Sequence, residues 1–345
     1  MPARRPRASL AALGEFQLID AIRRRFGRTG RSVRRGIGDD AAVVRLPPGH
    51  DLLLTTDLLA EGIHFDLSTA SYEDVGYKAA VANLSDIAAM GGTPRHILVA
   101  AAIPADCSPS HMQELYQGLM KACRRHGVEL IGGDTSGSRR GLVLTIVLTG
   151  SIEAGRALIR SGARPGDRLY VTGTLGDALA GLNLLGAGRR STRPADRALM
   201  DRHVRPAPRV NVGRLLAVRR LASAAIDLSD GLSGDLAHLC QQSRVGAEVV
   251  AAALPVSAAL RAYAVAHHAN PARLALTGGE DYELLFTAAP RHHAKIMRLA
   301  RETGCRISPI GVITSKKGVR LREPSGTLRR LPVLSYRHFQ SARSR

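Results

Sequence analysis

The sequence predicts an α+β protein built from two α/β domains. Its 345 residues exceed the length of one ordinary domain. Apolar strand-like runs and helix-like segments are mixed along the chain, and some neighbouring strands are separated only by tight turns, as in hairpins. We expect a mobile basic arm at 1–13, an N-terminal domain at 14–150 and a C-terminal domain at 151–345.

The N-terminal half contains the elements expected of a mixed sheet covered by helices. Apolar residues at helical spacing predict helices over 15–26, 72–90 and 111–126. Apolar or alternating runs predict strands over 41–46, 51–56, 96–103, 127–134 and 141–150. The turn "PPGH" separates the first two of these strands, which favours a hairpin-like connection.

The C-terminal half begins near Ser151 and contains two strand–turn–helix segments. These are "DRLYVTGTLGDALAGLNLL" and "ASAAIDLSDGLSGDLAHLCQQ", and "GAEVVAAALPV", "ELLFTAA" and "ISPIGVI" predict further strands. Arg, Pro and Gly are frequent from Gly186 to Pro208, which we interpret as a surface excursion that contributes charge rather than chemistry. Asp167 lies between arginines and is expected to be an ordinary turn residue.

The formal net charge of +20, with 49 basic and 29 acidic residues, raises the possibility of a nucleic-acid-binding protein. Aromatic residues make up only 3% of the chain, and no nucleic-acid-binding module is recognisable. We therefore favour a solvated basic surface, with no specific nucleic-acid partner.

The cysteines and the apolar runs favour a soluble cytoplasmic protein. None of Cys107, Cys123, Cys240 and Cys305 forms a C-x-x-C pair, so a zinc site or redox motif is not expected, and buried thiols in a reducing compartment are. The basic start of the chain has too short an apolar part for a secretory signal. No apolar run approaches the ~20 residues that span a bilayer, so we expect no membrane partner.

Several acidic turns occur in stretches that contain no lysine or arginine. In "GIGDDAAVV" the glycine-rich turn is followed by two aspartates, where a phosphate-binding loop would usually supply a positive charge. The arginine-free stretches are 36–44, 46–77, 79–94, 126–138, 221–243 and 274–290. They contain Asp39, Asp40, Asp57, Asp86, Asp134, Asp227, Asp230, Asp235 and Glu280. Unpaired carboxylates that converge would repel one another, and Mg²⁺ would relieve this while binding substrate phosphates.

Other phosphate-transfer and hydrolase motifs are absent from the sequence. It contains no G-x-x-x-x-G-K-[ST], no kinase H-R-D or D-F-G, no H-E-x-x-H and no G-x-S-x-G. "TGTLGD" lacks the spacing of a dinucleotide-binding turn and is better explained as a strand-to-helix turn.

The acidic stretches, taken in order, resemble those of bacterial thiamine-monophosphate kinases. The matching motifs are "GEFQLI", "GIGDDAAVV", "TTDLLAEGIHF", "YKAAVANLSDIAAMGG", "ELIGGDTSG", "IRSGARPGDRLYVTGTLGDALAG", "AIDLSDGLSGDL" and "LTGGEDYELLF". This resemblance covers about residues 14–339. It implies two aminoimidazole-ribonucleotide-synthetase-like domains and a homodimer in which N-terminal strands form a shared barrel.

The resemblance also implies roles for individual residues. Mg²⁺ would be bound by Asp40, Thr55, Thr56, Asp57, Asp86, Asp134, Asp227 and Asp230. ATP would be contacted by Tyr116, Gly133, Arg160 and Ser229, and the thiamine substrate by His64, Glu280 and Tyr336. The implied reaction is direct in-line transfer from ATP to thiamine monophosphate without a general base, because a phosphate monoester is already mostly ionised at neutral pH.

Three related enzymes and one unrelated class are the alternatives. Selenophosphate synthetase would need a reactive residue near the first glycine loop, but the first cysteine is Cys107. The hydrogenase-maturation relative would need a C-terminal cysteine, whereas the sequence ends "SARSR". Aminoimidazole-ribonucleotide synthetase is the closest enzymatic alternative, against which "EGIHF" and "GGEDYE" argue. A nucleic-acid-binding protein would leave the arginine-free acidic stretches unexplained.

Overall fold

The computed structural model describes residues 15–27, 32–35, 37, 43–188 and 193–336, which confirm the predicted α+β class. The chain divides into two compact units. Unit 1 comprises residues up to 87 together with 93–154, and unit 2 comprises 88–92 together with 155 onward. The expected basic arm at 1–13 lies outside the described residues.

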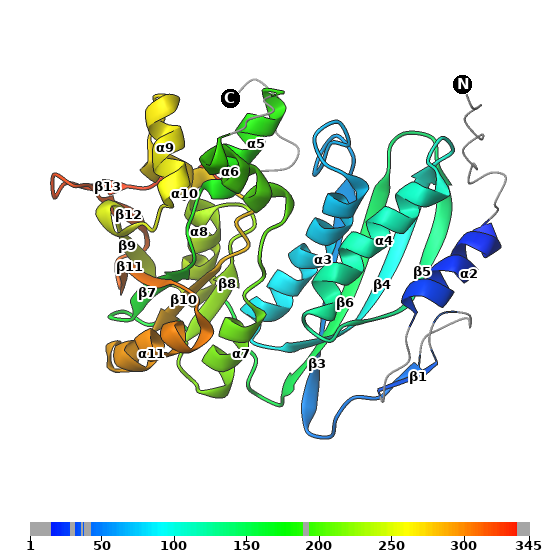
Figure 1. Cartoon of the computed structure of the whole chain (residues 1–345). Helices are drawn as coiled ribbons and strands as arrows, with labels where there is room; N and C mark the ends of the chain where they lie inside the picture. The colour runs from blue at the N-terminus through cyan, green and yellow to red at the C-terminus, as the bar shows by residue number, and fades with distance from the viewer. Residues whose placement is uncertain (1–14, 28–31, 36, 38–42, 189–192, 337–345) are drawn as a thin grey trace. The chain divides into compact units, whose positions relative to one another are not determined.

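Unit 1 contains a four-stranded mixed sheet. Its strands are β3 (His50–Ala60), β6 (Val143–Glu153), β4 (Thr93–Pro104) and β5 (Glu129–Ser138), paired in that order. Only β4 and β5 run parallel. Helices α3 (Tyr72–Ala89) and α4 (Pro109–Arg124) lie on one face of this sheet (Figure 1). The remaining elements are helix α2 (Glu15–Phe26) and the short antiparallel pair β1 (Val33–Arg35) and β2 (Val43–Val44).

Two glycines allow α3 and α4 to meet backbone to backbone. A Cβ atom added to Gly76 of α3 would lie 1.9 Å from the carbonyl oxygen of Leu115 of α4. A Cβ atom added to Gly118 of α4 would lie 1.8 Å from the carbonyl oxygen of Glu73 of α3. Both distances are far below any possible atomic contact, so only glycine fits at either position. This contact fixes α3, which carries Asp86, against α4.

The two faces of β3 differ in burial. Leu53 and Leu59 are buried on the face that the helices cover. Leu52, Leu54 and Leu58 point to the other face and are 43%, 67% and 55% exposed. This alternation follows from the two-residue period of a strand. One face of the sheet in unit 1 therefore presents a row of exposed leucines along its edge strand.

Unit 2 contains a seven-stranded sheet with the order β13-β12-β9-β11-β7-β10-β8. The strands are β7 (Arg168–Thr172), β8 (Ala224–Asp227), β9 (Gly246–Val250), β10 (Leu284–Ala288), β11 (Ile307–Thr314), β12 (Gly318–Arg322) and β13 (Leu328–Arg330). Most neighbours pair antiparallel, and β12 with β9 pairs parallel. The predicted strand–turn–helix segments around β7 and β8 are confirmed.

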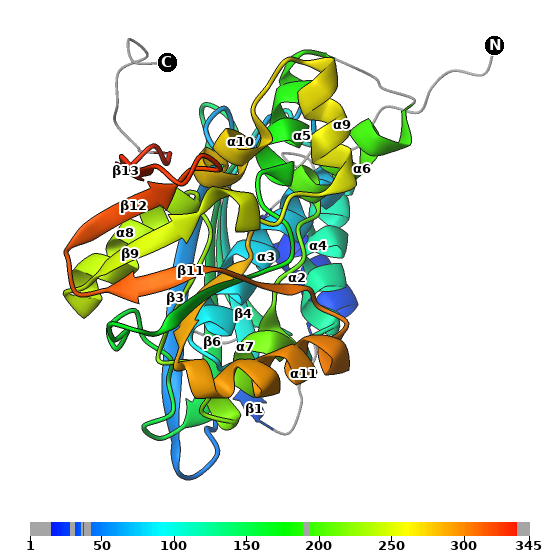
Figure 2. The same ribbon diagram turned by 90° about the vertical axis from the view of Figure 1, so that its left-hand side faces the viewer.

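The helices of unit 2 cover both faces and one end of the sheet. They are α5 (Asp177–Gly186), α6 (Pro194–Val204), α7 (Val210–Val218), α8 (Leu232–Ser243), α9 (Ala258–Ala266), α10 (Pro271–Thr277) and α11 (His293–Thr303), with 3-10 turns η1 (Ala251–Ala253) and η2 (Pro290–His292). Helices α5, α6 and α9 gather at one end, whereas α11 lies at the other (Figures 1 and 2).

Alternation along β7 divides the core of unit 2 into two layers. Leu169 and Val171 belong to the same buried cluster as Leu236 of α8. Tyr170, which points to the opposite face, stacks on Phe286 with ring centroids 5.2 Å apart, and its hydroxyl lies 3.1 Å from Nδ1 of His293. Helices α8 and α11 are therefore attached to opposite faces of one central strand.

The expected surface excursion between Gly186 and Pro208 is wrong in its central part. This stretch contains α6, of which Asp196, Leu199 and His203 are buried. Pro194 occupies the first turn of the helix, where a missing N–H costs nothing. The apolar and imidazole groups of α6 pack inward, while its arginines made the segment look wholly polar.

Asp167 is also not the ordinary turn residue that its sequence neighbourhood predicts. It is only 5% exposed, and its carboxylate accepts hydrogen bonds from the backbone N–H of Arg164 at 3.0 Å and from the hydroxyl of Ser223 at 2.6 Å. The flanking arginines do not reveal this, because the hydroxyl partner is distant in sequence.

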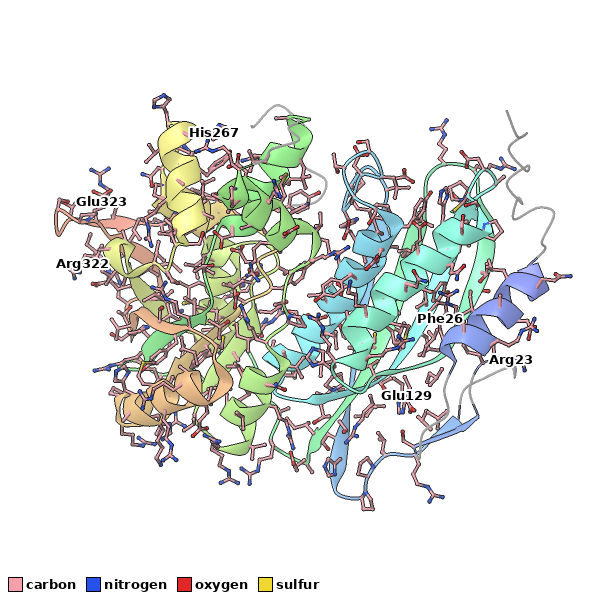
Figure 3. The ribbon with its side chains drawn as sticks, viewed as in Figure 1. Arg23, Phe26, Glu129, His267, Arg322 and Glu323 are labelled. Carbon is pink, nitrogen blue, oxygen red and sulfur yellow. The ribbon has the colours of Figure 1, made fainter. Side chains whose placement is uncertain are left out.

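Some of the basic side chains lie at the outer surface and pair there with carboxylates. Arg23 of α2 is 55% exposed and lies 2.6 Å from Asp20, and Arg322 of β12 is 45% exposed and lies 2.5 Å from Glu248 (Figure 3 labels both arginines). Such solvated pairs contribute at most about 1 kcal/mol each. Within the described part of the chain, no helix combines the length and apolarity needed to cross a membrane.

Candidate functional site

Unit 1 brings together Thr55, Asp57 and Asp86. Thr55 and Asp57 are two residues apart on β3, so their side chains share the face that the helices cover. Asp86 lies in the last turn of α3, and the Thr55 hydroxyl donates a hydrogen bond to its carboxylate. Burial and, second, the charge of Asp86 raise the pKa of Asp57 to about 6. Two close carboxylates whose charges repel each other form a suitable site for a cation.

Thr56 points away from this group. It lies between Thr55 and Asp57 on the strand and is exposed on the opposite face, together with the leucines. The structure therefore separates the Thr56 side chain from the other predicted ligands of β3.

Asp134 and Gly133 lie on β5, at the other edge of the same sheet. In the strand register, Asp57 pairs with Ile146, Ile146 with Val99, and Val99 with Gly133. Three strand spacings put Asp57 about 14 Å from β5. Ligands of one Mg²⁺ ion lie about 2.1 Å from the metal, so within unit 1 these two aspartates do not share an ion.

Gly133 is required by a close approach between strands. A Cβ atom at this position would lie 2.0 Å from the carbonyl oxygen of Val99. The carboxylate of the neighbouring Asp134 accepts a hydrogen bond from the N–H of Thr135 at 2.9 Å. The glycine thus lets β5 hold Asp134 beside β4.

Tyr116 and His64 are held in defined environments within unit 1. Tyr116 of α4 is 5% exposed and stacks on Phe26 of α2, with ring centroids 5.8 Å apart, and burial raises the pKa of its hydroxyl. Nδ1 of His64 accepts a hydrogen bond from the N–H of Ala60 at 3.0 Å, which leaves the proton on Nε2. Asp39 and Asp40 lie outside the described residues.

Unit 2 brings two of the acidic motifs side by side. The loop after β8 contains "DLSDG" (227–231), and the loop before β10 contains "GGEDYE" (278–283). The N–H of Glu280 donates to the carbonyl of Ser229 at 2.7 Å, and the N–H of Tyr282 donates to the carbonyl of Leu228 at 3.0 Å. Gly279 permits this approach, since a Cβ atom there would lie 2.7 Å from the Ser229 carbonyl oxygen.

Three carboxylates gather at the beginning of α8. Asp227 and Asp235 are 4% and 3% exposed, and Asp235 accepts hydrogen bonds from the backbone N–H groups of Asp230 and Gly231 at 3.3 and 3.1 Å. Burial and the charges of Asp227 and Asp230 raise the pKa of Asp235 to about 8. This is the second place where carboxylate charges oppose one another.

Neither group is a complete metal cage. Among the residues that the structure describes, no three His, Cys, Asp or Glu side chains are arranged to hold a metal ion together. Mg²⁺ commonly uses one or two carboxylates and keeps waters or substrate phosphates as its other ligands. The carboxylate groups of units 1 and 2 fit that kind of partial site.

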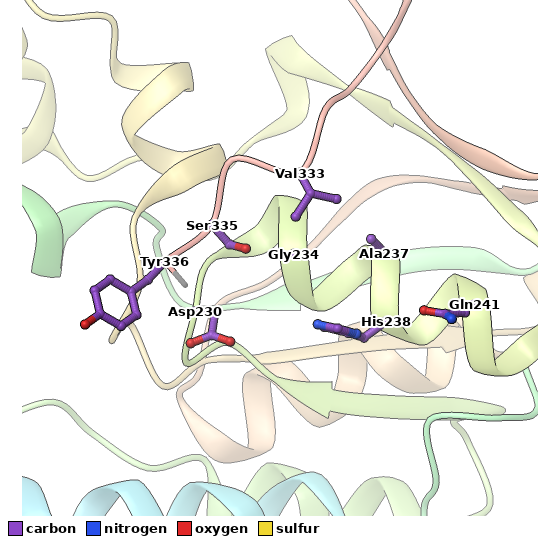
Figure 4. Close-up of a pocket in the computed structure, with 8 residues that line it drawn as sticks. All are labelled: Asp230, Gly234, Ala237, His238, Gln241, Val333, Ser335 and Tyr336. Atoms are coloured by element: carbon purple, nitrogen blue, oxygen red, sulfur yellow. The ribbon is translucent and has the colours of Figure 1, made fainter. Parts of the chain in front are cut away.

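Tyr336 lies at the rim of a pocket next to Asp230. The pocket has a volume of about 450 Å³ and is lined by Asp230, Gly234, Ala237, His238, Gln241, Val333, Ser335 and Tyr336 (Figure 4). The N–H of Tyr336 donates to the carbonyl of Asp230 at 3.2 Å. Gly234 makes room for the tail, because a Cβ atom there would lie 2.2 Å from the Ser335 hydroxyl oxygen.

Arg160 is not brought together with Ser229 and Asp230 within unit 2. Its carbonyl accepts a hydrogen bond from the hydroxyl of Ser243 at 2.9 Å, at the C-terminal end of α8. Ser229 and Asp230 precede the N-terminal end of the same helix, whose 12 residues span about 18 Å. The length of α8 therefore separates the backbone of Arg160 from the acidic loop.

Sequence reasoning missed an ion cluster around a fully buried glutamate beside this site. Glu283 is 0% exposed, and it accepts two hydrogen bonds from Arg209, one from Arg202 at 2.8 Å and one from the Thr172 hydroxyl at 2.6 Å. Burial acts to raise the pKa of Glu283, but the bonds and charges of the two arginines outweigh it and hold that pKa below its ordinary value. A stretch of sequence without arginine can therefore still be paired with arginines from other parts of the folded chain.

Asp281, between Glu280 and Tyr282, was also missed. Its carboxylate accepts hydrogen bonds from the backbone N–H groups of Gly176 and Ala178 at 2.7 and 3.2 Å, at the N-terminus of α5. Burial raises its pKa to about 7. The available signal was the density of acids in "GGEDYE", where three carboxylates occur within four residues.

Comparison with known proteins gives consistent matches over both units. Residues 38–152 and 164–323 match the N-terminal and C-terminal domains of AIR synthase related proteins. The thiamine-monophosphate kinase of Haemophilus influenzae is 38% identical over 308 residues, which are 89% of this chain and 91% of the relative.

Two solved structures extend this similarity. The crystal structure of thiamine-monophosphate kinase from Stenotrophomonas maltophilia has a TM-score of 0.80 and 37% identity, and the match covers 92% of this chain and 98% of that one. AaThiL complexed with AMPPCP and TMP has a TM-score of 0.76 and 35% identity, with 98% and 100% coverage.

The opposed carboxylates of unit 2 predict a pH-dependent stability of the metal-free protein. Because the folded-state pKa of Asp235, about 8, exceeds its ordinary value of 3.8, the protonated group stabilises the fold at low pH, and this contribution is lost as the pH rises toward 8. In EDTA, Asp235→Asn should therefore raise the melting temperature at pH 8 by at least about 2 °C relative to the wild type, with a smaller gain at pH 5.

The control for this experiment is Asp201→Asn, at an exposed aspartate of α6. It should leave the difference in melting temperature between pH 5 and pH 8 unchanged. Equal pH dependence in wild type and Asp235→Asn would contradict the charge repulsion at α8.

Proposed function

The chain belongs to the thiamine-monophosphate kinase family, and we infer from this that it transfers the γ-phosphoryl group of ATP to thiamine monophosphate, which yields thiamine diphosphate. The observation that carries this inference is the match along nearly the whole chain to such kinases, one solved relative of which holds AMPPCP and TMP. The pairing of the "DLSDG" and "GGEDYE" loops supports it, because it puts Ser229, Asp230 and Glu280 in one place.

The chemistry needs positioning more than acid–base catalysis. The attacking group is a phosphate-monoester oxygen with a second pKa of about 6, so it is already mostly ionised at neutral pH. Bringing two polyanions together in line is the main difficulty, and preorganised charges and backbone amides lower that barrier. The reaction we propose is a direct transfer without a phosphoenzyme.

Mg²⁺ is part of this proposal. In unit 1 it would be held by Asp57 and Asp86 with Thr55, and separately by Asp134; in unit 2 it would be held by Asp227 and Asp230. Asp40 and Thr56 complete the proposed set. When bound, Mg²⁺ supplies the positive charge that offsets the phosphates. The support from the structure is the repulsion between neighbouring carboxylates in each unit.

Binding of the two substrates is assigned to the remaining predicted residues. We propose that Tyr116, Gly133, Arg160 and Ser229 contact ATP, and that His64, Glu280 and Tyr336 contact thiamine monophosphate. The pocket at Tyr336 is of a size typical of small-molecule sites. Under this proposal residues 14–150 form the ATP- and Mg²⁺-binding domain that also dimerises, and 151–345 form the second α/β domain.

A homodimer would cover the exposed leucine face of β3. Leu52, Leu54 and Leu58 lie on one face of an edge strand, and such a strand with apolar side chains is prone to association. A symmetric dimer in which the sheets of two copies complete a barrel would bury this face.

A cytoplasmic location also belongs to the proposal. The reaction consumes ATP, and Cys107, Cys123, Cys240 and Cys305 are all free and buried, as is usual in a reducing compartment.

The substrate assay is the direct test of the proposed function. With ATP and Mg²⁺, the purified chain should convert thiamine monophosphate to thiamine diphosphate, detected by chromatography, and EDTA should stop the conversion. Unphosphorylated thiamine should not react, because an alcohol nucleophile would need a general base, a role that the proposal gives to no residue. Conversion of thiamine in place of its monophosphate would refute the proposal.

A matched pair of variants on β3 tests the metal assignment. Asp57→Asn keeps the shape of the side chain but removes charge beside Asp86, so kcat should fall at least about 100-fold. Asp51→Asn, at an exposed aspartate of the same strand, should change kcat less than about threefold.

The melting temperature in EDTA separates loss of metal binding from loss of fold. Since Asp57 and Asp86 repel each other in the metal-free protein, Asp57→Asn should melt no lower than the wild type. Full activity of Asp57→Asn, or an equal loss in Asp51→Asn, would overturn the assignment of Asp57.

A charge on the leucine face tests the dimer. Leu54→Glu should weaken self-association at least about tenfold, since it would bury a carboxylate in an apolar interface. Light scattering at micromolar concentration measures this. Val265→Glu, at an 80% exposed position of α9, is the control and should leave the mass unchanged. A wild-type monomer, or a Leu54→Glu variant that remains dimeric, would contradict the proposed interface.

A further inference from the structure

The segment that carries Glu280 has a strained backbone. Glu280 and Tyr282 adopt φ values of +63° and +50°, in the left-handed region that side chains other than glycine rarely occupy. Such conformations persist only where the surrounding structure holds them, and they concentrate at binding sites. The contacts that hold this segment therefore bear on where the Glu280 carboxylate points.

The backbone around Glu280 is fastened on several sides. The N–H groups of Glu280 and Tyr282 donate to the loop after β8, as described above. The Asp281 carboxylate is bound by the first N–H groups of α5. These bonds fix the path of the chain, but they do not fix the side-chain torsions of Glu280.

Helix α6 contacts the same segment through two consecutive residues. Nδ1 of His203 lies 3.4 Å from the Glu280 carboxylate, and the His203 residue is 7% exposed. Arg202 donates to the Glu283 carboxylate at 2.8 Å and to the carbonyl of Asp281 at 3.5 Å. One helix thus contacts both the side chain of Glu280 and the chain that follows it.

The position of α6 is itself set by close packing. A Cβ atom at Gly181 of α5 would lie 2.1 Å from the carbonyl oxygen of Leu199 and 3.1 Å from Cβ of His203. The two helices therefore meet at backbone distance, next to the His203 side chain. A buried imidazole on so tightly packed a helix has little freedom to turn.

We propose that His203 is a positioning residue, which aims the Glu280 carboxylate at the thiamine part of the substrate. The proposal rests on the proposed function of Glu280 as a substrate contact. It assigns a role in the kinase reaction to the arginine-rich stretch that the sequence suggested was only surface charge.

Glu280 and Glu283 differ in how available their carboxylates are to a ligand, because their side-chain partners differ. Glu283 is fully buried and neutralised by two arginines, so its charge is unavailable to a ligand. The side chain of Glu280 is 28% exposed, and an imidazole nitrogen lies 3.4 Å from its carboxylate. The Glu280 carboxylate is therefore accessible to the cationic thiazolium ring of thiamine, while the buried His203 limits its movement.

The test compares two replacements of His203 by steady-state kinetics. His203→Leu fills the site but removes the polar contact of 3.4 Å with the Glu280 carboxylate, so KM for thiamine monophosphate should rise about 10-fold, while KM for ATP changes less than about twofold. His203→Asn places a donor near the position of Nδ1 and should restore KM to within about threefold of wild type. His267→Leu, at a ring that stacks on Tyr263 of α9, is the control.

A double-mutant cycle distinguishes positioning from general damage to the fold. If His203 acts through Glu280, His203→Leu should raise KM for thiamine monophosphate less than about twofold in a Glu280→Gln background. The melting temperature of each variant identifies any variant that is merely unstable. If His203→Leu is unstable, His203→Asn replaces it in the cycle with Glu280→Gln and tests the same coupling.

The outcomes separate this inference from the proposed function. A wild-type chain inactive on thiamine monophosphate would refute the proposed function. An active wild type with an unchanged KM in His203→Leu, an equal rise in the KM for ATP, or additive effects in the cycle would refute the role of His203 alone.

Discussion

The burial of one carboxylate, that of Glu283, is the constraint around which unit 2 is arranged. A fully buried charge is tolerated only when it is paired and hydrogen-bonded, and here Arg202 of α6, Arg209 before α7 and Thr172 of β7 all converge on it. Removing one partner of such a cluster typically costs about 3–5 kcal/mol. The cluster therefore links three elements to the chain that enters β10, directly after Glu280.

The carboxylates proposed for function are arranged in the opposite way. Asp57 is opposed by Asp86, and Asp235 by Asp227 and Asp230, and burial adds to the repulsion in each case. Glu283 and the acids proposed for metal binding thus differ in what faces them: arginines face Glu283, and other acids face Asp57 and Asp235. The stability lost to this repulsion is the cost of keeping negative charge ready for a cation.

Much of the fold follows from local pattern, because periodicity and turn residues act over a few residues. The helix at 15–26 and the unit β8–turn–α8 agree with the prediction for this reason. The opposite faces of Thr55 and Thr56 were also deducible once a strand was predicted there, because consecutive strand residues point to opposite faces. The division into domains at 14–150 and 151–345 remains a prediction. In the described chain, residues 88–92 belong to unit 2, although they lie between two segments of unit 1.

What could not be predicted depends on partners distant in the chain. The arginine-free stretch at 274–290 suggested unpaired acids, but Glu283 is paired with arginines more than seventy residues earlier. Asp167 is buried because Ser223 reaches it across the sheet. Helix α6 was not predicted for the same reason, because its buried His203 contacts Glu280, which is distant in the sequence. Sequence spacing therefore could not show which of these acids are neutralised by arginines in the folded chain.

The contact between α3 and α4 has a consequence for how this sequence can change. Every missense change in a glycine codon introduces a side chain with a Cβ atom, so none is conservative at Gly76 or Gly118. Changing one position cannot compensate for the other, because each glycine faces a main-chain carbonyl and not the other glycine. Substitutions at these two codons are therefore not tolerated, and changes in α3 and α4 can accumulate only at positions outside their contact.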